Sequence, residues 1–326
     1  MAAKKVIYDT DPGVDDAMAL IFLDAAPDVE LVGITTVLGN HRIDTTTRNA
    51  LFLKDYFNIA APVAQGAGKP LVIDEGEPPV YVHGSNGLGD IPLPDIIRSK
   101  PHELPAHRFI IETVRANPHE ISIVAVGRMT NLALALREDP EIAALVKEIV
   151  IMGGAFGYRG HGGNVTPVAE ANIIGDPHAA DEIFAASWPI VVVGLDVTQE
   201  AVVSLTYLEQ LRDTAGRAGQ FIWDISRFYE NFYFQSTGLP GFPVHDSSAV
   251  GYLLDPTLFT TRAGPIRVVT EGIAIGQTIQ MPNNRSFPPG NAWEGRPDHL
   301  VCIDSDPERF LKLYFDTVVA ASRRDN

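Results

Sequence analysis

The sequence is poor in cysteine, in positive charge and in long apolar runs. Cys302 is the only cysteine among 326 residues, so no disulfide can form within the chain and we expect a buried thiol in a reducing compartment. The 25 Lys and Arg face 41 Asp and Glu, a net charge of −16, which argues against nucleic acid or an anionic membrane surface as partner. No segment approaches the ~18 apolar residues of a membrane span. We therefore expect a soluble, cytoplasmic protein.

Short β-branched runs alternate with segments of helical periodicity, a pattern typical of an α/β fold with a mostly parallel sheet covered by helices. Further strands are expected to extend the sheet around Val268 and Leu300. No repeat or composition shift marks a linker, so we predict one domain over residues 1–326. The sequence predicts strands at 5–9, 30–36, 121–126, 148–152 and 189–195, and helices at 14–25, 44–56, 130–137, 177–186, 218–234, 246–254 and 307–322.

Four aspartates, Asp9, Asp11, Asp15 and Asp16, crowd the segment VIYDTDPGVDDAMALIFL, where Asp9 ends the first predicted strand and the other three follow it. One interpretation is structural: Asp11 caps the helix, Pro12 takes its first position, and the later acids favour the helix dipole. That interpretation leaves Asp9 without a purpose. Asp11 and Asp16 can reach a common point across the turn, and several carboxylate oxygens around one point suit Ca²⁺ or Mg²⁺. We favour a metal site.

A second acidic candidate is the segment FPVHDSSAV, in which His245 and Asp246 precede an apolar helix. Asp246 is either a simple helix cap or a further metal ligand, and His245 is either an ordinary surface histidine or a group that faces a ligand. The functional interpretation requires this turn to lie at the carboxyl edge of the sheet, where ligands bind in parallel α/β folds.

The segment GGNVTPVAEANIIGD carries Asn164, Glu170 and Asn172 among small residues. If the segment is extended, Glu170 and Asn172 share one face, and mixed donors and acceptors without positive charge suit a polyhydroxylated ligand. The alternative is a polar loop with Asx-turns. No phosphate-binding glycine fingerprint opens a helix, which argues against nucleotide phosphates.

Four more side chains are candidates, although each has a structural alternative. Asn40 ends the segment ITTVLGN, and His83 lies in a glycine-rich loop, where a lone histidine is more often structural. Phe221, Phe228 and Phe232 recur near helical spacing, which indicates a core stripe. On another face of the same helix, Tyr229 and Tyr233 could stack on a flat ring.

Taken together, these motifs resemble the inosine–uridine-preferring nucleoside hydrolase family, in family order over nearly the whole chain. The aspartate motif with its DPG centre is the most specific of them. The resemblance implies a nucleoside hydrolase fold with a mostly parallel, Rossmann-like sheet flanked by helices, and hydrolysis of ribonucleosides to ribose and free base with one bound Ca²⁺. The matching motifs are DTDPGVDDAMAL, ITTVLGN, VHGSNGLGD, VGRMTNLALAL, IVIMGGA, NVTPVAEANIIGDPHAA, GLDVT and VHDSSAV.

The resemblance also implies roles for individual residues. Calcium is bound by Asp11, Asp16, Asp246 and the carbonyl of Val126, and Asp11 takes the proton of the calcium-bound water as general base. His245 is the natural proton donor to the departing base, with His83 also on the base side. Family members also lead us to expect a homodimer or homotetramer. The ribose hydroxyls are contacted by Asp15, Asn40, Asn164, Glu170 and Asn172.

Two departures from the family pattern bear on function. Arg128 and Met129 stand where glycine or proline with leucine is more usual, and Ala171 stands where an aromatic residue is frequent. A missing ring at Ala171 would open space near the 5′ end of the ribose, which affects substrate range.

Two other functions compete with nucleoside hydrolysis. A Mg²⁺-dependent phosphohydrolase could use the DTD sequence, but it needs Lys or Arg beside the phosphate, and none follows the first strand before Arg42. A calcium-dependent ribose- or nucleoside-binding protein without turnover would keep the metal shell, although the presence of Asp11 and His245 argues against it.

Overall fold

An eight-stranded sheet forms the centre of the computed structural model, which describes residues 3–238, 240–282 and 285–323. Its strands are parallel except β9, which pairs antiparallel with β12 at one edge. The predicted mostly parallel sheet is therefore confirmed. In sheet order the strands are β3 (Val63–Gln65), β2 (Val29–Thr36), β1 (Lys4–Thr10), β4 (Ile121–Ala125), β5 (Glu148–Met152), β6 (Ile190–Val193), β12 (His299–Ser305) and β9 (Phe259–Gly264).

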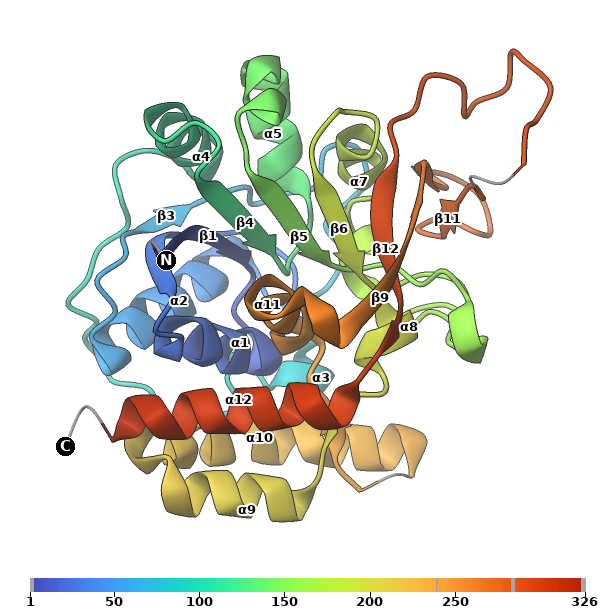
Figure 1. The fold of residues 1–326 in the computed structure, drawn as a ribbon. Helices are drawn as coiled ribbons and strands as arrows, with labels where there is room; N and C mark the ends of the chain where they lie inside the picture. The colour runs from blue at the N-terminus through green and yellow to red at the C-terminus, as the bar shows by residue number, and fades with distance from the viewer. Residues whose placement is uncertain (1–2, 239, 283–284, 324–326) are drawn as a thin grey trace.

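Helices cover both faces of this sheet (Figure 1), as a parallel sheet requires because both of its faces are apolar. In β1, Val6 and Tyr8 pack into one core cluster and Ile7 packs into the other. The first face is covered by α1 (Val14–Ala25), α2 (Ile43–Phe57) and α11 (His245–Leu254), with α10 (Gly216–Thr237) and α12 (Pro307–Ser322) packed outside them, and the second by α4 (Ala106–Ala116), α5 (Thr130–Glu138) and α7 (Pro177–Ile183).

The shorter elements lie outside these layers or connect them. One strand prediction is wrong: Val268 belongs to a separate antiparallel pair instead of the main sheet, whereas Leu300 lies in β12 as expected. The remaining elements are α3 (Val80–His83), α6 (Ala171–Gly175), α8 (Leu195–Thr198), α9 (Leu205–Thr214), the strand pairs β7 (Val202–Val203) with β8 (Phe242–Pro243) and β10 (Ile266–Val268) with β11 (Thr278–Gln280), and 3-10 turns at Pro140–Ala144, Tyr158–Gly160 and Pro256–Leu258.

The strand order reverses direction at β1, which lies between β2 and β4. From β1 the chain first moves outward to β2 and β3 and then crosses to β4 on the other side. The loops at the carboxyl ends of β1 and β4 therefore diverge and leave a crevice, where ligands bind in open α/β sheets. The aspartate segment follows β1 directly, so the topology places it at this crevice.

The start of α1 differs from the sequence prediction. The helix begins at Val14 with Gly13 as its N-cap, so Asp11 is not the cap and Pro12 does not occupy the first helical position. Asp16, three residues after the cap, accepts a hydrogen bond from the Gly13 amide over 2.9 Å. This bond satisfies a donor at the helix start and leaves Asp11 outside the helix, on the approach to it.

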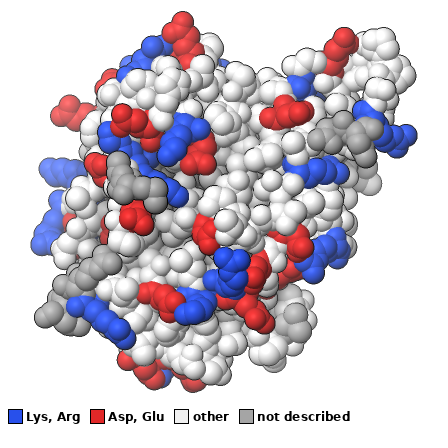
Figure 2. Space-filling view, in the orientation of Figure 1, with Lys and Arg blue, Asp and Glu red and all other residues white. Residues whose placement is uncertain are grey.

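Three features of the structure bear on the predictions from composition: the burial of the cysteine, the apolar character of the helices and the distribution of surface charge. Cys302 is fully buried, as predicted. Among the described residues, no helix combines the length and apolar character that a membrane crossing requires. Figure 2 shows acidic and basic side chains intermingled over one face, so the negative net charge does not gather into a single acidic patch there.

Candidate active site

A cavity of about 600 Å³ opens at the carboxyl ends of the central strands. Val126 and Met152, which end or follow β4 and β5, contribute to its floor, and residues of α1, α3, α10 and α11 contribute to its walls. The cavity is therefore located at the crevice that the topology predicts. Of the residues that the sequence singles out, it is lined by Asp15, Asn40, His83, Val126, Asn164, Glu170, Asn172, Tyr229, Tyr233, His245 and Asp246.

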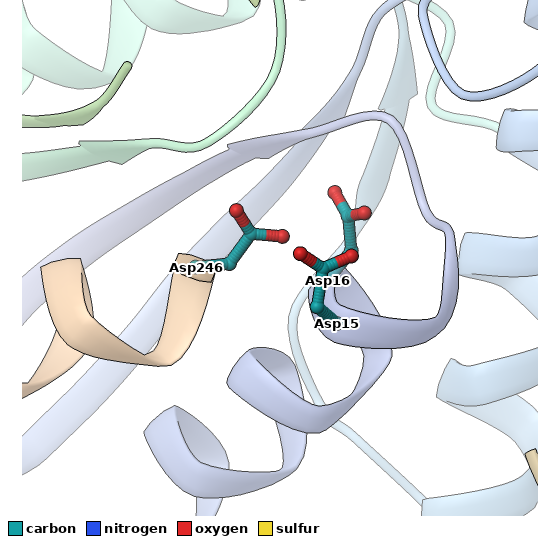
Figure 3. A group of neighbouring side chains, drawn as sticks. All are labelled: Asp15, Asp16 and Asp246. Atoms are coloured by element: carbon teal, nitrogen blue, oxygen red, sulfur yellow. The ribbon is translucent and has the colours of Figure 1, made fainter. Parts of the chain in front are cut away.

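Three carboxylates meet beside this cavity, and with Asp11 we call them the acidic cluster. Asp15 and Asp16 come from the first turn of α1, and Asp246 comes from the first turn of α11. One oxygen of each lies within 4.8 Å of the others, and the side chains point toward a common space (Figure 3). All three are buried. The structure thus joins two acidic segments that are 230 residues apart in the chain, as 246 − 16 = 230.

Asp11 is buried at the edge of this group, and only one of its oxygens is bonded. Its Oδ2 accepts the amide of Asn40 over 2.7 Å, whereas the buried Oδ1 has no hydrogen-bond partner among the described residues. A Cβ atom at Gly39 or Gly127 would lie 1.8 or 2.7 Å from the Asp11 carboxylate oxygens. Only glycine leaves room at these positions for the carboxylate.

Asp16 is bonded through both oxygens, whereas Asp9 is bonded only through Oδ1 and its buried Oδ2 has no partner among the described residues. Asp16 accepts the Thr10 hydroxyl over 2.6 Å and the Asn40 side-chain amide over 2.8 Å, in addition to backbone amides. Asp9 accepts Thr35 and Asn131 through Oδ1. These bonds give Asp9 a structural role that the sequence did not reveal, because they join β1 to β2 and to α5.

Burial and mutual repulsion make these carboxylates costly to ionise. Desolvation and the charge of Asp16 raise the pKa of Asp11 well above its usual range and that of Asp15 to about 7. Desolvation and the neighbouring carboxylates likewise raise the pKa of Asp246. The Arg128 guanidinium, whose Nη1 lacks a described partner, acts against the rise at Asp11.

The donor set fits a divalent cation. Asp11 Oδ1 and Asp15 Oδ1 are buried acceptors without partners among the described residues, and an unpaired buried acceptor costs about 1–3 kcal/mol. Carboxylate and carbonyl oxygens without nitrogen or sulfur are the ligands of hard cations. A cation here would give the unpaired oxygens of Asp11 and Asp15 a partner. It would also offset the repulsion between carboxylates that raises their pKa values.

The segment that carries Asn164, Glu170 and Asn172 is helical in part, so Glu170 and Asn172 do not share a face of an extended strand, the condition under which they were expected to converge. Glu170 is the N-cap of α6, and its carboxylate accepts the amides of Asn172, Ile173 and Gly154. The Asn172 side-chain amide donates to the carbonyls of Val126 (2.7 Å) and Met152 (3.1 Å). The two side chains nevertheless both line the cavity, because a short helix brings them there instead of a strand.

Opposite these groups, His83, Tyr229, Tyr233 and His245 form what we call the aromatic wall. His245 is bonded on both ring nitrogens, to Thr198 Oγ1 through Nδ1 (2.7 Å) and to the Tyr233 hydroxyl through Nε2 (2.8 Å). The Tyr229 hydroxyl donates to Asp15 over 3.2 Å and so links the wall to the acidic cluster. Desolvation lowers the pKa of His245 to about 4, which makes the imidazole neutral near pH 7.

His83 is held firmly in the wall. Its ring stacks on Tyr229 with centroids 5.3 Å apart, and Nδ1 accepts the amide of Val14 over 3.2 Å. Desolvation lowers the pKa of His83 to about 3, so the ring is neutral and its proton resides on Nε2. His83 can therefore donate one hydrogen bond without carrying a charge.

Sequence reasoning missed three contributors to the site. Thr198 supports His245, Met152 accepts from Asn172, and Arg128 lies close enough to Asp11 to lower its pKa. Thr198 lies in the GLDVT motif and Arg128 departs from the family pattern, but neither residue was predicted to belong to the site. A better signal was available for Thr198, because it ends a motif directly after a strand that finishes at the same edge as β1.

The family model, the similar sequences and the similar structures all point to nucleoside hydrolases. A family model described as inosine-uridine preferring nucleoside hydrolase matches residues 6–312. Uridine nucleosidase 1 of Arabidopsis thaliana is 41% identical over 95% of this chain and 91% of its own. The inosine-uridine preferring nucleoside hydrolase of Crithidia fasciculata is 36% identical over 97% of both chains. Among solved structures, a plant nucleoside hydrolase superposes with a TM-score of 0.92 at 37% identity and covers 97% of this chain and 99% of its own.

Proposed function

Because this chain belongs to the inosine-uridine preferring nucleoside hydrolase family and is an N-glycosidase of nucleosides, we propose that it hydrolyses purine or pyrimidine ribonucleosides at the acidic cluster, with Asp11 as general base. The observation that carries this assignment is the buried Asp11 Oδ1, which has no hydrogen-bond partner among the described residues. A buried carboxylate oxygen without a described partner, next to the carboxylates that line a sugar-sized cavity, is suited to accept a proton.

We propose Ca²⁺ as the resident ion, held by Asp11, Asp16, Asp246 and the Val126 carbonyl. When bound, the ion supplies positive charge that offsets these carboxylates and makes a nearby water more acidic. The convergence of Asp16 and Asp246 within 4.8 Å supports this ligand set. The third carboxylate of this converging group is Asp15 and not Asp11. We therefore propose that either Asp11 or Asp15 completes the protein ligands of the ion.

The substrate is held from two sides. We propose that Asp15, Asn40, Asn164, Glu170 and Asn172 bind the ribose hydroxyls. Asp15 Oδ1 has no hydrogen-bond partner in the part of the chain that the structure describes, and Asn40 bonds both Asp11 and Asp16. The negative charge around the sugar favours the positive charge that develops on C1′ as the base departs.

The aromatic wall contacts the base and supplies the proton that the base needs to depart. We propose that His245 delivers a proton to the base and that His83, Tyr229 and Tyr233 contact its ring. The imidazole of His245 is neutral before substrate binds, so it must first gain a proton. The Tyr233 hydroxyl, bonded to Nε2 over 2.8 Å, lies between His245 and the Tyr229 hydroxyl and provides a route for that proton.

The test is steady-state kinetics on inosine, adenosine, guanosine, uridine and cytidine, each repeated after chelation and after Ca²⁺ is restored. The proposal expects equal amounts of ribose and free base, loss of most activity in chelator, and recovery with Ca²⁺. Nucleoside binding without ribose release would instead indicate a binding protein. Phosphate release from simple esters with Mg²⁺ would indicate the phosphohydrolase.

Three further predictions accompany the function. We propose a role in purine or pyrimidine salvage, a cytoplasmic location because the chain has one buried cysteine, and a homodimer or homotetramer. Light scattering of the purified protein measures the last of these directly, and a monomeric mass at micromolar concentration would contradict it.

A further inference from the structure

Arg128 is a half-buried cation that the proposed mechanism does not use. It departs from the family pattern, and its Nη1 is buried without a hydrogen-bond partner among the described residues. A guanidinium stays protonated in proteins, and a buried charge is costly unless it is paired. Arg128 therefore places a permanent positive charge where its surroundings do not fully compensate it.

The backbone of Arg128 lies beside two of the proposed metal ligands. Val126, whose carbonyl is one of them, is two residues earlier, so the two Cα atoms are at most about 7.6 Å apart. Gly127, between them, lies against Asp11, because a Cβ atom at Gly127 would be 2.7 Å from Asp11 Oδ1. This oxygen, like Arg128 Nη1, is buried and has no partner in the described part of the chain.

The side chain of Arg128 packs against α6. A Cβ atom at Gly175, the last residue of this helix, would lie 2.4 Å from Arg128 Nε and 2.8 Å from its Cδ. The same helix carries Asn172, whose side-chain amide donates to the Val126 carbonyl over 2.7 Å. One short helix thus contacts both a proposed metal ligand and the arginine. The guanidinium is therefore part of the scaffold of the site and does not extend freely into solvent.

Three carboxylates act on this guanidinium, and two of them have other partners. Burial lowers the pKa of Arg128, and the charges of Asp11, Asp176 and Glu75 oppose this shift. Asp176 accepts hydrogen bonds from two backbone amides and a threonine hydroxyl, and Glu75 pairs with Arg42 over 3.3 Å. Of the three, Asp11 is the one with a buried oxygen that lacks a described partner. The charge of Arg128 is therefore available to the acidic cluster.

We propose that Arg128 is a counter-charge to the acidic cluster and weakens its hold on the divalent cation, so that bound and free ion exchange readily. This inference rests on the proposed calcium site. In the metal-free chain the guanidinium attracts carboxylates that otherwise repel one another. Once a cation lies among them, the guanidinium repels that cation. Both effects reduce the free energy that is gained when the ion binds.

The experiment is isothermal titration of the metal-free chain with Ca²⁺, at about pH 8.5 so that few protons compete with the ion. For Arg128→Met, which removes the charge and keeps most of the side-chain length, we expect the Kd for Ca²⁺ to fall at least about fivefold. Arg128→Lys keeps the charge and should stay within about twofold of wild type. The matched control is Arg227→Met, because Arg227 is also half-buried but is paired with Glu230 over 2.6 Å. Its Kd should equal that of wild type.

The direction of the change separates this role from a structural one. Damage to the scaffold would weaken Ca²⁺ binding, whereas loss of a counter-charge strengthens it. The rise in Tm on addition of Ca²⁺ should accordingly be larger for Arg128→Met than for wild type, and Arg128→Gln replaces it if the Met variant does not fold. An equal or higher Kd in the neutral variant overturns the proposal. A wild-type chain that binds no Ca²⁺ would instead overturn the proposed calcium site, and this inference with it.

Discussion

The acidic cluster and the aromatic wall face each other across one cavity but are built in different ways. Asp11 and Asp16 both accept backbone amides, Asp16 accepts two side chains as well, and only glycine at positions 39 and 127 leaves room for the Asp11 carboxylate. His245 and Tyr233 are bonded through side chains, to Thr198 and to each other. Side-chain bonds can exchange partners without moving the backbone. The cluster is therefore preorganised for a step common to all substrates, whereas the wall can adapt to different bases.

The largest expected effect tests the cluster. Asp11→Asn should lower kcat by about 100-fold or more while KM changes little, because the amide still fills the space but cannot accept the proton. Asp9→Asn is the matched control, since Asp9 lies two residues earlier and already accepts from Thr35 and Asn131. A kcat for Asp11→Asn within about threefold of wild type would show that Asp11 is not the base.

The wall should show its effect only where the leaving group needs a proton. His245→Ala should lower kcat on inosine by about 30-fold, within the range of general acid catalysis. On p-nitrophenyl riboside, whose leaving group needs no proton, the same variant should lose less than about threefold. Equal losses on the two substrates would remove the acid role from His245 and leave it as a binding residue.

Metal affinity should depend on the charge of Asp246 and not on that residue's neighbours in the chain. Asp246→Asn should raise the Ca²⁺ concentration for half-maximal activity by about tenfold or more, because a charged ligand becomes neutral. Ser247→Ala is the control, because Ser247 is equally buried and its hydroxyl has no described partner. Isothermal titration with Ca²⁺ measures both variants. If the two bind Ca²⁺ equally well, Asp246 is not a ligand.

The smallest effect concerns stability and its dependence on pH. Burial raises the pKa of Asp9 to about 6 and that of Asp15 to about 7, above the usual 3.8. At these two carboxyls the native metal-free chain binds protons more tightly than the unfolded chain, so their contribution to stability is fully present below about pH 4 and is lost as pH rises through 6 and 7. We expect Ca²⁺ to raise Tm by a few degrees more at about pH 8 than at about pH 5. An equal rise at both would contradict the prediction.

Much of the fold could be predicted because its signals are local. The strand β5 and the helices α1 and α12 have the bounds that the sequence predicts. The helix α6 was missed because five residues are too few to show helical periodicity. The separate pairing of Val268 was missed because a strand does not reveal its partner.

The candidate site was predictable as a set of residues but not as a set of contacts. Sequence motifs pointed to Asp16 and Asp246, which the fold brings together. They could not indicate that Asp9 accepts a hydrogen bond from Asn131, 122 residues away, or that Tyr233 bonds His245. Such bonds depend on the tertiary arrangement and leave no periodic trace in the chain. The excess of aspartates thus has two causes, one structural at Asp9 and one chemical at the cluster.

The most direct test of the account is anomalous diffraction from a crystal grown with Ca²⁺. The account predicts one ion between Asp16 and Asp246, with Asp11 or Asp15 and the Val126 carbonyl completing its protein ligands. An ion elsewhere, or well-ordered Asp16 and Asp246 carboxylates with no ion between them, would contradict it.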